Sequence, residues 1–156
     1  MDTTKTEEQF KRVMDECRTL FAKKLHDYGA SWRILRPSSL TDQLFIKAKR
    51  IRSLEITGTS LVGEGIRPEF IALINYGIIG LIQLEKGYVD TVDTKPEEAL
   101  ALYDAHAKEC LELMLRKNHD YNEAWRDMRI SSYTDFILTK IQRIKEIEGL
   151  DGKTLV

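Results

Sequence analysis

The stretch Lys24-Leu25-His26-Asp27-Tyr28-Gly29-Ala30-Ser31-Trp32-Arg33 returns 93 residues later as Lys117-Asn118-His119-Asp120-Tyr121-Asn122-Glu123-Ala124-Trp125-Arg126. Without a gap, residues 16–55 align with residues 109–148, and 18 of the 40 aligned positions are identical. Self-similarity at a fixed offset indicates a duplicated structural unit. The shared pattern Lys-x-His-Asp-Tyr-x-x-x-Trp-Arg is called the signature below, with a first copy at 24–33 and a second at 117–126.

The two copies differ mainly at apolar positions. Phe21 corresponds to Met114, and Leu44 corresponds to Ile137. Protein cores tolerate such exchanges of similar volume. Both tryptophans and most polar residues of the repeat are unchanged, which packing alone does not require. We therefore expect any active or binding site to lie at the signature.

The pattern around each signature predicts helices. Apolar residues at helical spacing lead up to the first copy, and that helix is expected to end near Lys24. Thr94-Lys95-Pro96-Glu97 predicts a capping box with proline at the first helical position of the corresponding helix. Beyond the signatures, Ser39 and Ser132 are expected to cap helices at about 40–55 and 133–148. Gly29 is replaced by Asn122, an exchange compatible with a left-handed backbone at a helix end.

These features predict an all-α protein. We expect one domain, 1–156, built as a helical bundle from tandem repeats at 9–56 and 100–149. A loop at 57–67 and an apolar central helix at 68–86 join the repeats. Because this helix is apolar on nearly all sides, it is expected to be buried between the halves. A subunit interface is the second interpretation, so a homodimer is kept as an alternative.

Composition and charge argue against several classes of protein. The net charge of −1 argues against general nucleic-acid binding, which needs an excess of Lys and Arg. The polar, acidic start lacks the features of a secretion signal, so a cytoplasmic location is expected. The apolar run at 70–84 is shorter than the roughly 20 residues that span a bilayer, so no membrane partner is expected. Cys17 and Cys110 are expected to be packing thiols.

The signature and the helix after it bring together aromatic and cationic side chains. The aromatic rings could stack on a base, and the cations could bind phosphates, arginine through its bidentate fork. The candidate ligand-binding residues are Lys24, Tyr28, Trp32, Arg33, Lys47 and Arg50, with Lys117, Tyr121, Trp125, Arg126, Lys140 and Arg143 in the second copy. The alternative is structural: the aromatics belong to the core, and the cations pair with nearby carboxylates.

One imidazole and one carboxylate per copy are the candidates for proton transfer. They are His26 and Asp27, and His119 and Asp120. Because adjacent residues do not face one another in a helix, a working pair requires an irregular loop or a contact across copies, such as His26 with Asp120. One His and one Asp are fewer than the three or four ligands of a catalytic zinc. The sequence therefore does not decide whether a metal is bound, and magnesium is the candidate.

The signature, followed by Asp-x-x-x-x-Lys-x-x-Arg-Ile, resembles that of a family first described as a domain of unknown function and later as nucleotide modification associated domain 1. Both repeats carry the resemblance. It implies a helical fold and a role related to phage and bacterial nucleotide or DNA-base modification. It does not imply a particular reaction.

A more distant similarity is to the all-helical nucleoside triphosphate pyrophosphatases, which hold magnesium with pairs of acidic residues. Glu109-Cys110-Leu111-Glu112 fits the first half of that pattern, whereas Glu148-Gly149-Leu150-Asp151 fits the second half only formally. Magnesium-dependent pyrophosphohydrolysis is therefore an alternative function.

The leading hypothesis is that the duplicated signature binds a nucleotide or a related phosphate ligand, in two pockets or in one composite site. Whether a reaction follows is left open. The alternative from another class is a non-catalytic interaction protein, in which the signature is a rigid polar bracket.

Overall fold

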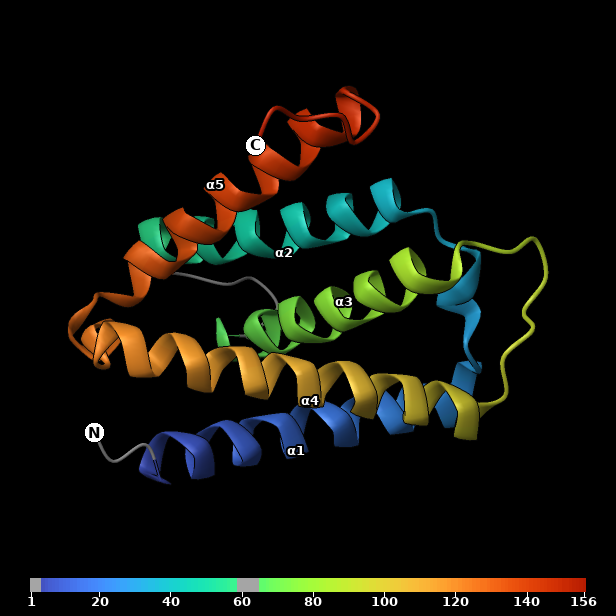
Figure 1. Ribbon diagram of the computed structural model, residues 1–156, viewed down its shortest axis with the longest axis horizontal. Coiled ribbons are helices and arrows are strands. Elements are labelled where there is room, and N and C mark those ends of the chain that lie inside the picture. The colour runs from blue at the N-terminus through green and yellow to red at the C-terminus, as the bar shows by residue number, and fades with distance from the viewer. Residues whose placement is uncertain (1–3, 59–64) are drawn as a thin grey trace.

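The computed structural model describes residues 4–58 and 65–156, and within them it contains helices and no strand (Figure 1). The predicted all-α fold is therefore confirmed. The five α-helices are α1 (Thr4–Tyr28), α2 (Pro37–Thr57), α3 (Arg67–Lys86), α4 (Pro96–Tyr121) and α5 (Ile130–Gly149). Two short 3₁₀ helices, η1 (Ser31–Ile34) and η2 (Ala124–Asp127), follow α1 and α4. Each half of the chain therefore has the same order of elements: a long helix, a short 3₁₀ turn and a second helix.

The signature starts in the last turns of α1 and α4. The prediction that the first helix ends near Lys24 was wrong, because α1 continues to Tyr28. Both helices end with a left-handed residue, Gly29 at φ 65° and Asn122 at φ 53°. The N–H of each donates to the carbonyl four residues earlier, at 2.8 and 2.9 Å. The predicted left-handed end at this Gly/Asn exchange is confirmed.

The predicted serine caps were wrong. Helix α2 begins at Pro37 and α5 at Ile130, and no side chain caps either helix. Proline fixes φ near the helical value and starts α2 two residues before Ser39. Helix α4 does begin with Pro96, as expected, but its N-cap residue is Lys95 and no capping box forms. The Thr94 hydroxyl instead accepts a hydrogen bond from Arg33.

Helices α1 and α4 lie side by side and run in opposite directions (Figure 1). Near the middle of α1, Arg18 makes a bidentate pair with Asp104 of α4. At the start of α1, Thr6 accepts a hydrogen bond at 2.7 Å from Arg126, which follows α4. The two signatures therefore lie at opposite ends of this helix pair, on the order of 30 Å apart at 1.5 Å per residue. A contact between His26 and Asp120 is not formed.

Helices α2 and α5 pack against each other through reciprocal hydrogen bonds. The Thr41 hydroxyl donates to Glu148 at 2.6 Å, and the Thr134 hydroxyl donates to Glu55 at 3.3 Å. The two threonines are equivalent in the repeat, as are the two glutamates. The retention of these four residues in both copies is thus explained by the pairing of the two helices.

Helix α3 lies against α1, α2 and α4. Its Ile78, Ile79 and Ile82 join Phe21 and Tyr103 in the larger apolar cluster of the core. Most of its residues from Glu69 to Gln83 are buried or half-buried, whereas Leu84 near its C-terminal end is 70% exposed. The helix thus contacts helices of both halves, and its burial between the halves stays a prediction. Most of the predicted loop at 57–67 lies outside the described residues. Cys17 and Cys110 are both free thiols.

Candidate functional site

A cavity of about 580 Å³ opens between α1, η1, α2 and α3. Four predicted ligand-binding residues of the first copy line it: Lys24, Tyr28, Trp32 and Lys47. Small-molecule sites in proteins usually measure about 300–1,000 Å³, so this cavity has the size of a ligand pocket. We call it the α3-covered pocket.

Apolar side chains form much of the inner wall of the α3-covered pocket. Phe21, Leu25 and Ile79 line it and belong to the core. The Trp32 and Phe21 ring centroids are 6.0 Å apart, which holds the indole against the core. Tyr28 is exposed and forms part of the rim. The first copy therefore combines an aromatic ring packed on the core with an exposed one.

Helix α3 contributes a buried carboxylate that the sequence analysis missed. Glu69 Oε1 lies 3.4 Å from Arg50 Nε, and its Oε2 lies 3.7 Å from Lys47 Nζ. Glu69 is buried, and Oε2 has no hydrogen-bond partner in the described part of the chain. The two repeated cations on α2 thus have a common acidic partner at the edge of the pocket. The available signal was the spacing of Lys47 and Arg50, which places both on one helix face.

Asn75 is the second residue of α3 that the sequence analysis did not select. Its amide nitrogen donates to the Cys17 carbonyl at 3.1 Å, and its oxygen accepts from the Tyr103 hydroxyl at 2.8 Å. Burial raises the pKa of Tyr103, so the phenol keeps its proton for this bond. Asn75 therefore has one fixed orientation in the pocket wall.

Arg33 is buried, with only 1% of its surface exposed, and its guanidinium has internal partners. It donates to the Gln83 side chain and to the Gly87 carbonyl, the latter at 2.6 Å. Its Nε also lies 3.3 Å from Thr94 and from Asp93. Hydrogen bonds from Thr94 and Arg33 lower the pKa of Asp93. Arg33 thus ties η1 to the end of α3 and to the chain that enters α4.

His26 and Asp27 lie outside the lining of the α3-covered pocket. Their side chains are 3.1 Å apart, and the imidazole is 88% exposed. The expectation that adjacent residues on a helix do not face one another was wrong for His26 and Asp27. Both side chains are exposed at the helix end, where no neighbour keeps them apart. His119 and Asp120 repeat this contact at 3.4 Å and border a surface hollow with Leu115 and Arg116. A catalytic role for the four residues stays a prediction.

The second copy has a different environment. The Trp125 indole donates to Asn118 at 2.7 Å, and the Arg126 guanidinium lies over the Trp125 ring, 4.5 Å from its centroid. Arg126 also pairs with Glu123 at 2.9 Å. Hydrogen bonds from Thr6, Asn118 and Arg126 lower the pKa of Glu123 to about 2. The other candidate residues of this copy are exposed: Lys117, Tyr121, Lys140 and Arg143.

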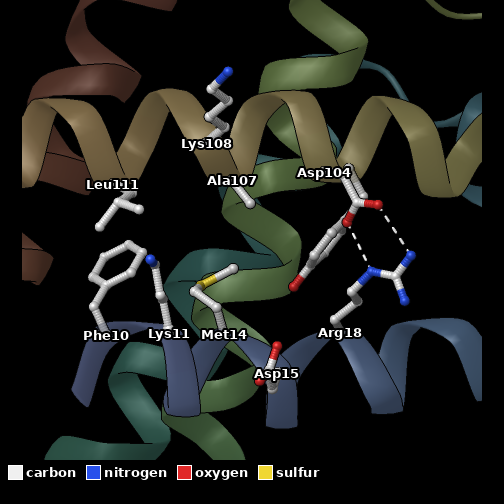
Figure 2. A pocket seen from close by; sticks show the side chains of 10 residues that line it. Phe10, Lys11, Met14, Asp15, Arg18, Asp104, Ala107, Lys108 and Leu111 are labelled. Atoms are coloured by element: carbon white, nitrogen blue, oxygen red, sulfur yellow. Dashed lines mark hydrogen bonds and ion pairs between the residues drawn. The ribbon is translucent and has the colours of Figure 1, made fainter. Parts of the chain in front are cut away.

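A smaller hollow of about 180 Å³ lies between α1 and α4, midway between the signatures (Figure 2). Phe10, Met14 and Leu111 line it, and the Arg18–Asp104 pair lies at one end. No signature residue reaches it. In residues 4–58 and 65–156, no three His, Cys, Asp or Glu side chains are grouped so as to hold a metal ion.

A family model described as nucleotide modification associated domain 1 matches the chain over residues 24–84 and 117–156. The match covers about two-thirds of the sequence, and the chain belongs to this family. Each matched segment begins at the lysine of a signature copy, in agreement with two copies of the unit. The first segment includes α3 as far as Leu84, and α3 forms one wall of the pocket. No match was found among curated proteins or solved structures. No helix in the described part of the chain combines the length and apolar character needed to cross a bilayer.

Proposed function

We propose that the α3-covered pocket binds a nucleotide or a related small molecule that carries phosphate. The observation that carries the proposal is that Trp32, Tyr28, Lys24 and Lys47 line one cavity, although they come from three elements. The family's description, which names nucleotide modification, supports the same ligand class.

Each lining group has a distinct part in this proposal. The Trp32 ring, held against Phe21, is the stacking surface for a base, and Tyr28 closes over it from the rim. Lys24 and Lys47 supply positive charge for the phosphates. Glu69 orients Lys47 through its ion pair, so that the ammonium group is positioned before the ligand arrives.

The second copy is not expected to bind this ligand with comparable affinity. In the first copy, α3 provides the wall opposite the signature, whereas Lys117 and Lys140 are exposed to solvent. A phosphate there would meet screened charges and would be held weakly. We therefore propose one small-molecule site per chain.

Calorimetry and thermal-shift measurements test this proposal. The full chain would be titrated with ribo- and deoxynucleoside mono-, di- and triphosphates, with and without magnesium. We expect at least one of them to stabilise the protein, and the double variant K24A/K47A to weaken its binding about tenfold or more. The double variant K117A/K140A removes the same charges from the second copy and is the matched control. No binding across the panel at millimolar concentration, or equal losses in both variants, would contradict the proposal.

A further inference from the structure

Helix α5 carries an exposed stripe of apolar and cationic side chains. The stripe consists of Phe136, Lys140, Arg143, Ile144 and Ile147, whose spacing places them on one helix face. Phe136 is 55% exposed, and the two isoleucines are each 40% exposed. The face that packs on α2 is a different one and contains the buried Thr134 and Ile141. Helix α5 is therefore apolar on two faces, and only one of them is covered.

The corresponding stripe on α2 shows what kind of helix packs on such a face. The equivalent of Ile144 is Ile51, which is 0% exposed and packs in one cluster with Leu73 of α3. The equivalents of Lys140 and Arg143 are Lys47 and Arg50, which both pair with Glu69 of α3. The α2 stripe is thus covered by an amphipathic helix that brings a carboxylate in its first turn.

No helix of the described chain covers the equivalent side chains on α5. Within residues 4–58 and 65–156, Lys140 and Arg143 have no carboxylate at ion-pair distance. Two unpaired cations beside exposed isoleucines form a surface complementary to an acidic, amphipathic helix.

We propose that the α5 stripe docks an amphipathic helix of another protein. A Glu or Asp near the start of that helix pairs with Lys140 and Arg143, and its apolar side chains pack on Ile144 and Ile147, as Glu69 and Leu73 pack on α2. The proposal does not depend on the ligand in the α3-covered pocket.

A second copy of this chain fits the stripe less well. A two-fold dimer through this short face would bring the Lys140 and Arg143 side chains of both chains together, and like charges oppose such an arrangement. The helix of the chain that has the required pattern, α3, already covers its own α2.

A peptide titration tests the proposal. The probe is a fluorescein-labelled synthetic peptide with the sequence of residues 65–88, and fluorescence anisotropy reports its binding to the full chain. We expect saturable binding that weakens about tenfold or more in the K140E/R143E variant and with an E69Q peptide. The K11E/K108E variant makes the same change in net charge near the α1–α4 hollow and should bind normally.

Three results would overturn the proposal. The first is no binding of the peptide at any soluble concentration. The second is equal binding to the wild type and to K140E/R143E, which circular dichroism should show to be equally helical. The third is a dimer in light scattering that K140E/R143E dissociates, because the stripe would then belong to a second copy of the chain.

Discussion

The two signature copies have the same residues and different surroundings. The first copy lies under α3, with Arg33 buried and Trp32 against the core. The second copy lies at the other end of the α1–α4 pair, where Arg126 stacks on Trp125 near the surface. Identical side chains thus form a pocket wall at one end and an open polar cluster at the other. The pocket at the first copy therefore depends on the covering helix α3 and not on the signature alone.

A second contrast lies where each signature copy contacts the start of the neighbouring long helix, which is α4 for the first copy and α1 for the second. At the first copy, Ala30 and Ala99 are both fully buried in the apolar core. At the second copy, the equivalent positions are Glu123 and Thr6, which are joined by a hydrogen bond. The duplicated halves have therefore diverged into an apolar end and a polar end.

The largest expected difference is between the two signature arginines. Arg33→Ala should destabilise the protein by about 3–5 kcal/mol, because it leaves the buried partners of the guanidinium without a donor. Arg126→Ala should cost about 1 kcal/mol or less, since Gln9 and Glu123 are partly exposed and the buried Thr6 keeps its hydrogen bond to Glu123. Urea unfolding of both variants measures the difference. Equal losses would show that the two ends are not different in burial.

The next largest difference in stability is expected between variants of the equivalent isoleucines Ile51 and Ile144. Ile51→Ala should cost about 3 kcal/mol, because Ile51 is fully buried between α2 and α3. Ile144→Ala should cost less than about 1 kcal/mol in the isolated chain, since Ile144 is half exposed. Thermal unfolding provides the comparison. A large loss in Ile144→Ala would mean that the α5 stripe is already covered in the purified protein.

The α2–α5 contact should show no difference between the copies. Thr41→Val and Thr134→Val each remove one of the reciprocal hydrogen bonds to Glu148 and Glu55. Each variant should lose about 1 kcal/mol of stability, and the two losses should agree within about 0.5 kcal/mol. Chemical denaturation checks this symmetry. A loss confined to one threonine would argue against equivalent pairing.

The smallest expected effect is a loss of stability at acidic pH, and it arises at the second copy only. The pKa of Glu123 is about 2 in the folded protein, against an ordinary value of 4.5. Its contribution is therefore present above about pH 4.5 and is lost as the pH falls towards 2. In Glu123→Gln, stability should depend less on pH across this window. Urea unfolding at pH 6, 4.5 and 3 measures it, and parallel curves for variant and wild type would contradict the assignment.

The helical part of the fold could be predicted because its signals are local. Apolar spacing located the helices, and the Gly29/Asn122 exchange located their left-handed ends. The Ser39 cap was mispredicted because Pro37 offers an earlier start. Helix α5 begins at the equivalent position, Ile130, without a proline, and the structure does not explain that start. The position of α3 could not be predicted, because the apolar faces of α2 and α5 carry nearly the same pattern and only one of them is covered.

The candidate site was located in part. The signature predicted Lys24, Tyr28 and Trp32, and the helix after it predicted Lys47; all four line the same pocket. Glu69 was missed because a single acid after a proline at a helix start is typical of an exposed first turn. The burial of Arg33 could not be foreseen, because its partners Gln83 and Thr94 lie outside the repeat.

We propose that a nucleotide or phosphate ligand binds at the first signature copy and not at the second. The protein has two tryptophans, so its ¹⁵N-labelled form gives two indole N–H signals, which W32F and W125F assign. During titration with the nucleotide that stabilises the protein most, the Trp32 signal should shift and saturate, and the Trp125 signal should stay in place. A saturable shift of Trp125 alone, or equal shifts of both signals, would contradict binding at the first copy only.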